Sequence, residues 1–350
     1  MWVVEKKRLT ARHKDDEEVA ARITIMKGFG SEMPREIISE ISSICQVKLP
    51  VGETLNIRRN RLSPADGAEN SGKRIGIVTG IHGDELEGQY VCYEVIRRIR
   101  EQPEYLAGIV DVYPAMNPMG IDSITRGIPG FDLDMNRIFP GSEDGAMTEY
   151  VAHKIIEELS GADLVVDIHA SNIYLTEIPQ IRINELSKDT LVPLARHMNV
   201  DFVWVHAAST VLESTLAYSL NSTGTPTLVV EAGVGMRITK AYCEQLADGL
   251  MNTMKILGIW QGETRSVREP IVDDRADGVV FFNAPRAGIF VPEAKHWTEL
   301  AEGDKVGDIV NPLTGEVLSE ITTPEKGILF TIREYPVVDE GSLVGRLLKV

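Results

Sequence analysis

Between residues 74 and 257 the chain alternates short apolar runs with longer amphipathic stretches. The runs are rich in β-branched residues and bounded by turn residues, which is typical of buried strands. They cover residues 74–80, 109–113, 164–168, 202–205 and 227–230. The stretches between them have apolar residues at helical spacing and predict helices at residues 84–101, 147–159, 187–198, 211–220 and 238–257. This alternation predicts an α/β fold with a mainly parallel or mixed sheet flanked by helices.

The N-terminal part of the chain has a different pattern. Residues 1–45 carry many charges, and we interpret them as an N-terminal extension with a short helix near residues 34–43. Residues 47–62 form two strand-like runs around a Pro-Val-Gly-Glu turn, which predicts a β-hairpin. Residues 63–73 are polar and rich in Gly, Pro, Asn and Asp, so they predict a loop.

The pattern changes again beyond residue 262. From residue 278 onward, glycine and proline separate short strand-like runs, which predicts a smaller all-β domain. Residues 303–310 resemble the barrel-sandwich fold of biotinyl and lipoyl carriers, although no Met-Lys-Met turn presents a carrier lysine. We therefore expect an α/β domain at residues 46–262 and a C-terminal, barrel-sandwich-like β domain at residues 263–350.

Composition and charge exclude several classes of protein. The chain has 350 residues and a formal net charge of −16, with no block of Lys and Arg that would indicate a nucleic-acid-binding surface. No apolar run has the length of a membrane span, and the charged N-terminus lacks the apolar core of a signal peptide. The 3 cysteines are far apart, which favours reduced thiols over disulfides. We therefore expect a cytoplasmic protein that binds neither nucleic acid nor membrane.

The first candidate metal ligands lie where the strand at residues 74–80 ends. His82 and Glu85 stand in the sequence Thr-Gly-Ile-His-Gly-Asp-Glu, which leads into the helix predicted at residues 84–101. An imidazole and a carboxylate three positions apart can converge on one point across such a turn, as zinc ligation requires. The alternative is that the acidic residues only favour the helix N-terminus electrostatically. A third ligand and a base decide between the two.

His169 and Glu231 supply these two groups. His169 follows the strand at residues 164–168, at the same sheet edge, so it can be the third ligand and leave one coordination position for water. Asp167 is predicted to face away from His169. Glu231 follows the strand at residues 227–230, and a carboxylate there suits a general base that takes a proton from water activated by zinc. The alternatives are a structural core histidine and a solvent-facing loop acid.

A long irregular segment at residues 117–145 holds further polar candidates. Loops of this length in a compact domain are usually functional or disordered. Asn136 and Arg137 are adjacent, and such a pair can bind a substrate carboxylate, the arginine through its planar fork. Arg126 can stabilise the oxyanion that develops as water attacks a carbonyl. Asn117, in an Asn-Pro-Met-Gly turn, is a further candidate for substrate binding. Each of these, taken singly, is also compatible with an ordinary loop residue.

Together the ordered motifs resemble the succinylglutamate desuccinylase/aspartoacylase family, a branch of the zinc carboxypeptidase-like fold. The order is His-Gly-Asp-Glu, Asn-Pro-Met-Gly, Arg, Asp-Met-Asn-Arg, Asp-Ile-His and Glu, and it spans about residues 74–257. The resemblance implies a hydrolase of N-acyl amino acids. It also implies a single zinc ion in each chain, bound by His82, Glu85 and His169.

The same resemblance implies roles for the other candidates. Glu231 would be the base and proton shuttle, and Arg126 would polarise the scissile carbonyl. Asn136 and Arg137 would hold the α-carboxylate of the amino acid portion. The C-terminal β domain would border the active-site cleft, and a homodimer is possible by analogy with the family.

One segment departs from family members that act on acidic amino acids. Those members use further basic residues between the histidine ligand and the base, whereas no Lys or Arg lies between Arg196 and Arg237. An acidic substrate side chain then lacks a charge partner from this segment, and Glu213 would favour a neutral or amine-bearing one. We therefore expect a zinc-dependent hydrolase that cleaves the amide bond of N-acyl amino acids with a neutral or basic side chain.

Two other functions use the same residues. A metallocarboxypeptidase that acts on short peptides needs the same zinc ligands and base. A non-catalytic protein that binds an amino acid or metabolite would keep the fold but lose a ligand or the base, and all of them are present here.

Overall fold

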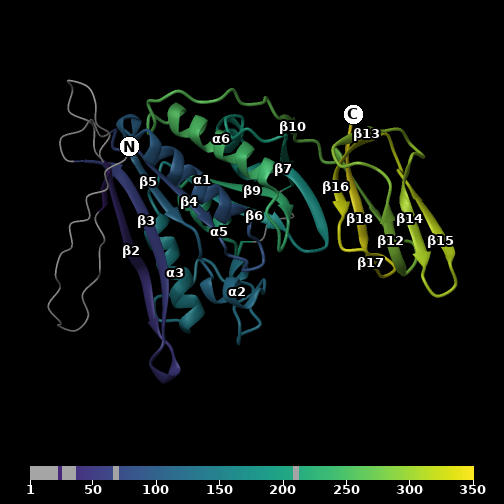
Figure 1. Ribbon diagram of the computed structural model, residues 1–350, viewed down its shortest axis with the longest axis horizontal. Helices are drawn as coiled ribbons and strands as arrows, with labels where there is room; N and C mark the ends of the chain where they lie inside the picture. Colours follow the sequence, from purple (N-terminus) through teal and green to yellow (C-terminus); the bar gives the residue numbers. More distant parts are fainter. Residues whose placement is uncertain (1–22, 26–36, 66–70, 208–212) are drawn as a thin grey trace, which may run out of the picture.

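The computed structural model describes residues 23–25, 37–65, 71–207 and 213–350. A large mixed sheet runs through the molecule, with helices on both faces and an all-β region at the C-terminal end (Figure 1). These features confirm the predicted fold class. Parts of the predicted N-terminal extension, of the loop at residues 63–73 and of the helix at residues 211–220 lie outside the described residues. Among the described residues, no helix is long and apolar enough to cross a membrane.

Parallel strands form the centre of the large sheet, in the order β5, β4, β6 and β9. They span Ile109–Tyr113 (β5), Arg74–Thr79 (β4), Leu164–Ser171 (β6) and Thr227–Val234 (β9). Each agrees with a predicted strand. Because the strands are parallel, their carboxyl ends lie at one edge of the sheet, which is where ligands bind in folds of this kind.

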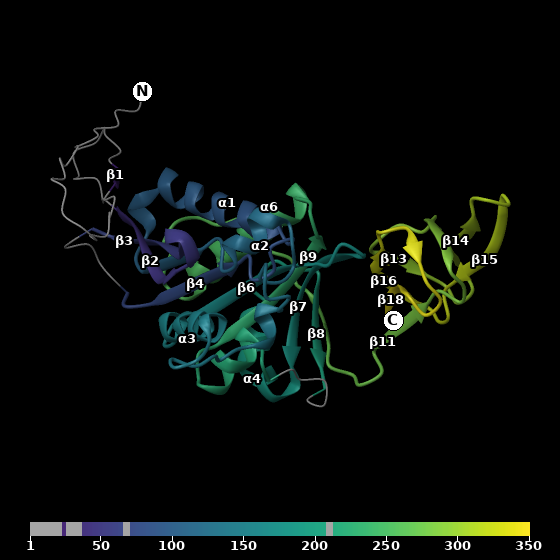
Figure 2. The same cartoon turned by 90° about the horizontal axis from the view of Figure 1, so that it is seen from below.

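Helices cover both faces of these strands. They are α1 (Glu87–Glu101), α2 (Pro118–Ser123), α3 (Met147–Leu159), α4 (Lys188–Ala195), α5 (Leu216–Ser222) and α6 (Lys240–Ile256). Helices α1 and α6 pack together on one face, and α3 packs with α5 on the other (Figure 2). In β4, Ile75 and Ile77 join the core beneath α1 and α6, whereas Val78 joins the core beneath α3. Burial on both faces explains why these strands are continuous apolar runs.

An antiparallel hairpin extends the sheet beyond β5. It consists of β2 (Ile37–Lys48) and β3 (Thr54–Pro64), and β1 (Ile23–Ile25) pairs with β2. The predicted hairpin is confirmed, but the predicted helix near residues 34–43 is wrong, because residues 37–43 belong to β2. This segment is rich in β-branched isoleucine, which fits a pleated strand, and pairing with β3 satisfies its backbone.

The sheet continues on its other side through β7 (Leu175–Asn184), which lies antiparallel to β9. Strand β8 (Phe202–His206), which the sequence predicts, pairs with β7 and with β10 (Ile271–Asp273). The sequence pattern does not predict β7. Pro179 lies in its middle, and proline inside an apparent strand argues against that assignment.

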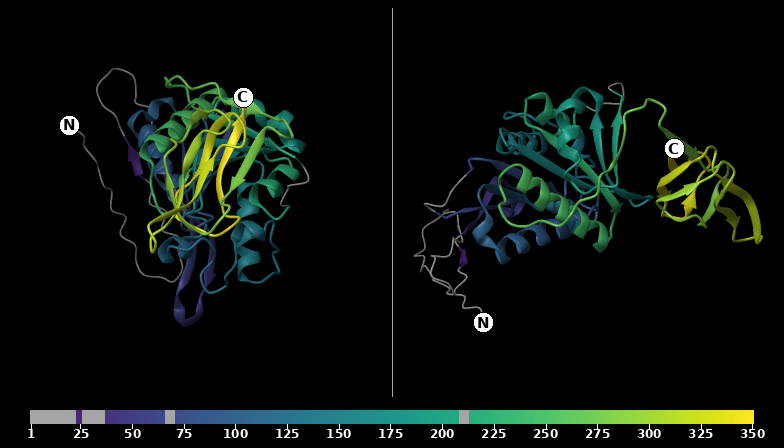
Figure 3. Two further views of the ribbon diagram at one scale, coloured as in Figure 1. Left: turned by 90° about the vertical axis from the view of Figure 1, so that its right-hand side faces the viewer. Right: turned by 90° about the horizontal axis from the view of Figure 1, so that it is seen from above.

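The C-terminal region is all β, as predicted. Its strands are β11 (Val279–Asn283), β12 (Gly288–Pro292), β13 (Thr298–Leu300), β14 (Lys305–Asn311), β15 (Glu316–Thr322), β16 (Gly327–Arg333), β17 (Val337–Val338) and β18 (Leu343–Lys349). One sheet has the order β15, β14, β12, β17, whereas β16, β18 and β11 continue the large sheet because β16 pairs with β7. The region (light green to yellow in Figure 3) therefore lies at one end of the large sheet, and its strands β16, β18 and β11 are part of that sheet. The domain boundaries after residues 45 and 262 remain a prediction.

Candidate active site and metal centre

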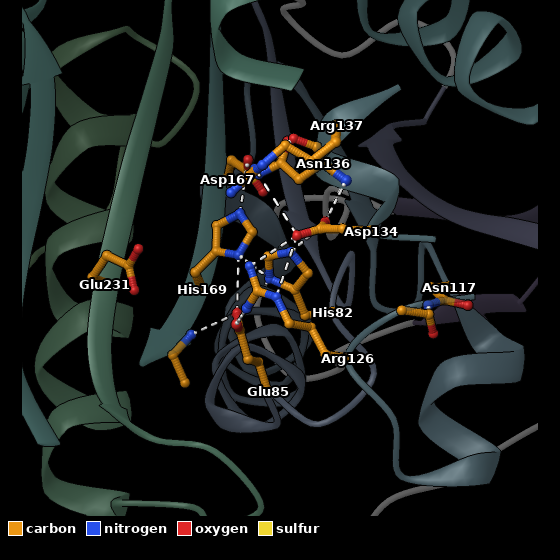
Figure 4. A network of polar contacts seen from close by, with 12 residues as sticks. His82, Glu85, Asn117, Arg126, Asp134, Asn136, Arg137, Asp167, His169 and Glu231 are labelled. Carbon is orange, nitrogen blue, oxygen red and sulfur yellow. Dashed lines mark hydrogen bonds and ion pairs between the residues drawn. The ribbon is translucent and has the colours of Figure 1, made fainter. Parts of the chain in front are cut away.

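Three side chains, two from the loop between β4 and α1 and one from β6, meet at the carboxyl ends of these strands (Figure 4). His82 lies in the loop after β4, Glu85 lies just before α1, and His169 lies near the end of β6. His82 Nδ1 lies 2.8 Å from Glu85 Oε1 and 3.2 Å from His169 Nδ1, and His169 Nδ1 lies 2.9 Å from Glu85 Oε2. All three residues are buried, and one ligand atom of each lies within 4.8 Å of the others. The structure thus brings the three predicted ligands together.

A carboxylate binds the far nitrogen of each histidine ring. Asp134 Oδ1 lies 3.0 Å from His82 Nε2, and Asp167 Oδ2 lies 3.1 Å from His169 Nε2. The prediction that Asp167 faces away from His169 is wrong, because residues two apart in a strand share a face. A carboxylate at Nε2 favours the tautomer that carries its proton there, which leaves the Nδ1 lone pair available to a metal ion.

The charges in this cluster favour a bound cation. Burial alone would raise the pKa of Glu85, but His169 and His82 lower it to about 2, so the group is a carboxylate at neutral pH. Burial lowers the pKa of His169, yet Asp167 and Glu85 outweigh burial and raise it. Two imidazole nitrogens and a carboxylate that face one point form a donor set used in catalytic zinc sites. The residues present therefore fit a zinc ion.

A cavity of about 580 Å³ lies beside this cluster, and Glu231 from β9 forms part of its wall. Glu231 is directly opposite His169 in the register of β6 and β9. Its Oε1 accepts a hydrogen bond from Arg182 Nη1 at 3.2 Å. Burial raises the pKa of Glu231, and Arg182 offsets this only in part. Glu231 is a partly buried carboxylate, with a side chain 15% exposed to the cavity, and its place beside the cluster and its raised pKa suit a general base.

Close contact between two loops places Arg126 over the cluster. The Gly83 N–H donates to the Arg126 carbonyl oxygen at 3.3 Å. A Cβ atom at Gly83 would lie 2.0 Å from the carbonyl carbon of Gly120, so only glycine permits this approach. Arg126 Nη1 then reaches Glu85 Oε1 at 3.0 Å, and Nη2 reaches Asp134 Oδ2 at 3.2 Å. The guanidinium also lines the cavity, where it can stabilise negative charge on a reacting oxygen.

The order and geometry of these residues agree with a known domain. Residues 71–257 match the succinylglutamate desuccinylase/aspartoacylase catalytic domain. The chain belongs to the succinylglutamate desuccinylase/aspartoacylase family. The resemblance that the sequence motifs indicate is therefore confirmed.

Three relatives of the chain share limited sequence identity with it. The N-alpha-acetyl-L-2,4-diaminobutyric acid deacetylase of Halomonas elongata is 35% identical over 101 residues, or 29% of either protein, so the match spans less than a third of this curated relative. A succinylglutamate desuccinylase/aspartoacylase structure from Rhodobacter sphaeroides has a TM-score of 0.73 at 23% identity and covers 89% of this chain and 95% of its own. The product-bound ectoine utilization protein EutE (DoeB) of Ruegeria pomeroyi has a TM-score of 0.75 at 19% identity, covering 96% of this chain and 100% of its own. The two structures establish the shared fold.

Asn136 and Arg137, which the family resemblance assigns to substrate, both line the cavity. They lie in a 3-10 turn, Met135–Arg137. The Asn136 side-chain oxygen accepts a hydrogen bond from the Leu216 N–H at 2.9 Å, which joins this turn to the start of α5. The Arg137 side chain is 42% exposed, so its planar fork is accessible to a carboxylate in the cavity.

Two predicted substrate-binding residues do not line the cavity. Asn117 is buried and caps α2: its side-chain oxygen accepts from the Gly120 N–H at 2.9 Å, and its Nδ2 donates to the Gly127 carbonyl at 3.0 Å. Its amide is thus committed to the loop structure. Glu213 is exposed and is absent from the cavity wall. We therefore assign neither residue to the substrate.

Three charged residues of the cavity wall are not predicted from the sequence, namely Glu177 and Arg182 from β7 and Arg346 from β18. The segment between residues 196 and 237 does lack Lys and Arg, but the arginine that binds Glu231 comes from outside it. A correct prediction of β7 as the neighbour of β9 would have indicated Arg182. No local pattern in the sequence indicates Arg346.

The carboxylates behind the histidines lead to a testable prediction. Replacement of Asp167 with asparagine is expected to weaken zinc binding about 10–100-fold, because a neutral amide does not raise the basicity of the His169 ring as the carboxylate does. Competition with a chromophoric chelator measures the affinity. Asp163→Asn, at the opposite end of β6, is the matched control. Equal zinc affinity in Asp167→Asn and wild type would contradict the role of Asp167.

Proposed function

We propose that the protein is a zinc-dependent hydrolase that cleaves the amide bond of N-acyl amino acids. The observation that carries this proposal is the convergence of His82, Glu85 and His169 on one point, with Glu231 on the adjacent strand facing the same cavity. Membership of the desuccinylase/aspartoacylase family supports it, as does the deacetylase activity named for the Halomonas elongata relative.

The roles of the side chains follow from their places in the cavity. When bound, zinc supplies Lewis-acid polarisation of the acyl carbonyl and lowers the pKa of the attacking water. Glu231 takes a proton from that water and then delivers it to the leaving amine. Arg126 stabilises negative charge on the carbonyl oxygen. Asn136 and Arg137 bind the α-carboxylate and orient the amide.

A neutral or basic substrate side chain fits the charges of the cavity better than an acidic one. The wall formed by α5 is neutral, with Tyr218, Asn221 and Ser222. Arg182 and Arg346 also line the cavity, but both are bound to the carboxylate of Glu177. Glu231 also binds Arg182, so the two carboxylates together compensate the two positive charges. The amine-bearing compound in the name of the Halomonas elongata relative supports the same preference.

Protonation of Glu231 should limit the reaction at low pH. The base acts in its deprotonated form, and burial raises the pKa of Glu231. A raised pKa moves protonation to higher pH, so kcat/KM is expected to fall on acidification with a midpoint above about pH 4.3, the ordinary value for glutamate. A pH series of initial rates measures the midpoint. A midpoint at or below the ordinary value would contradict this assignment.

A substrate panel tests the proposed function. The zinc-loaded protein is given N-acetyl and N-succinyl derivatives of neutral, basic and acidic amino acids, together with short peptides, and amine release is measured. Fastest release from neutral or basic derivatives supports the proposal. Fastest release from N-acetylaspartate would contradict the side-chain preference, and turnover of peptides alone would favour a metallocarboxypeptidase. Tight binding without any turnover would favour a non-catalytic binding protein.

A further inference from the structure

Strand β7 contains a β-bulge beside Glu231. Glu177 is opposite Gly233 and Gln180 is opposite Glu231, so β7 has one more residue than β9 between these pairs. In a regular strand, residues three apart face opposite sides of the sheet. The extra residue brings Glu177, Gln180 and Arg182 to one side, as their contacts show. The bulge therefore aims a row of polar side chains at the neighbourhood of the base.

Glu177 is the centre of this row, and its carboxylate is saturated. Oε1 accepts hydrogen bonds from Arg182 Nη2 at 3.0 Å and from Arg346 Nη1 at 2.6 Å. Oε2 accepts from Gln180 Nε2 at 2.7 Å and from the Thr331 hydroxyl at 2.5 Å. A carboxylate has about four acceptor sites, and Glu177, which is 1% exposed, has a partner for each.

These contacts connect the C-terminal region to Glu231 across adjacent strands. Arg346 in β18 is opposite Thr331 in β16, and Thr331 is opposite Glu177 in β7. Arg182 then uses its second amino group, Nη1, to bind Glu231 in β9 at 3.2 Å. The result is a row of alternating charge, Arg346–Glu177–Arg182–Glu231, which we call the charge row.

We propose that Glu177 and Arg346 are positioning residues that hold Arg182 on Glu231, so that the C-terminal region orients the base. This inference rests on the proposed function, because it takes Glu231 as the base. Its physical reason is the saturation of Glu177. While Arg346 occupies one acceptor site, Arg182 makes a single bond to Glu177 and keeps Nη1 for Glu231. Without Arg346, Glu177 can bind Arg182 through both amino groups and draw it away from Glu231.

Kinetics of the full-length zinc-loaded protein test the proposal. Arg346→Met and Glu177→Gln are each expected to lower kcat about 10–100-fold. KM should change little, since the charge row acts on the base in the transition state and not on substrate binding. Arg346→Lys, which keeps the positive charge opposite Glu177, should recover most of the lost rate. The double variant Glu177→Gln with Arg346→Met should be no slower than the slower single variant, because both break one unit.

Glu334→Gln is the matched control. Glu334 binds Thr176 at the same junction of β7 and β16, at 3.0 Å, but on the exposed surface. The Glu334→Gln substitution should leave kcat and KM unchanged. Equal losses in the control and in Arg346→Met would assign the effect to docking of the C-terminal region and overturn the proposal. A loss confined to KM, or no rescue by lysine, would also overturn it.

Crystal structures of the same variants test the inference without turnover. In Arg346→Met the 3.2 Å contact between Arg182 and Glu231 should be lost, and in Arg346→Lys it should remain. An unchanged contact in Arg346→Met would overturn the proposal even if the enzyme is slow. An inactive wild type would instead contradict the proposed function, while the contact in the variants still decides whether Arg346 positions Arg182.

Discussion

Replacement of Glu231 with glutamine is expected to lower kcat about 10²–10⁴-fold, the usual contribution of a general acid–base. Glutamine has nearly the same shape and keeps an acceptor for Arg182, but it cannot take a proton from water or return one to the leaving amine. Zinc content should stay at the wild-type level, because Glu231 is outside the His82, Glu85 and His169 cluster. Steady-state kinetics and metal analysis of the same preparation measure kcat and zinc content in the variant and in wild type.

Glu157→Gln is the control for this substitution. Glu157 lies on α3 with a 61% exposed side chain. The Glu157→Gln substitution therefore removes one negative charge, as Glu231→Gln does, but from the surface. Kinetics like those of wild type are expected. Retention of most of the activity in Glu231→Gln would contradict the base assignment. Loss of zinc in that variant would show instead that Glu231 is a metal ligand.

Replacement of His169 with alanine is expected to weaken zinc binding by more than the roughly 10–100-fold expected for an outer partner such as Asp167. The substitution removes one of three protein ligands, and it also leaves Glu85 without one of its two histidine partners. Zinc at about one hundred times its dissociation constant should stabilise the wild-type fold by about 2.7 kcal/mol, through mass action alone. In His169→Ala this zinc-dependent rise in thermal stability should disappear.

Thermal unfolding with and without added zinc measures the effect of His169→Ala. His153→Ala, on α3 and outside the His82, Glu85 and His169 cluster, is the matched histidine control and should keep the zinc-dependent shift. An equal shift in wild type and His169→Ala would contradict the ligand assignment.

The centre of the site could be predicted because each of its residues follows an apolar strand. His82, His169 and Glu231 lie at or just beyond the ends of the predicted runs, and the parallel order of β4, β6 and β9 brings those ends to one edge. Strands are predicted from the local pattern of apolar residues, and strand–helix–strand units predict that successive strands are parallel and joined by right-handed crossovers. This is why the sequence predicts the three candidate zinc ligands and the carboxylate beside them together.

The rest of the site depends on pairing that sequence patterns do not specify. Strand β7 contains Pro179, which argues against a strand in the sequence, so the bulge that turns Glu177 and Arg182 toward Glu231 could not be predicted. Arg346 reaches the cavity only because β16 joins β7 far away in the sequence. Asn117 shows the reverse situation: its position in a motif predicts substrate binding, whereas its side chain caps α2 and does not line the cavity.

Dependence of turnover on zinc is the decisive test of the proposed zinc-dependent hydrolysis. The purified protein is analysed for metal, stripped with a chelator, and reassayed for amine release from its best N-acyl amino acid as zinc is restored. We expect about one zinc ion per chain, loss of turnover on stripping, and full recovery at about one equivalent. Turnover that persists in the stripped protein, or a protein that binds no zinc, would contradict it.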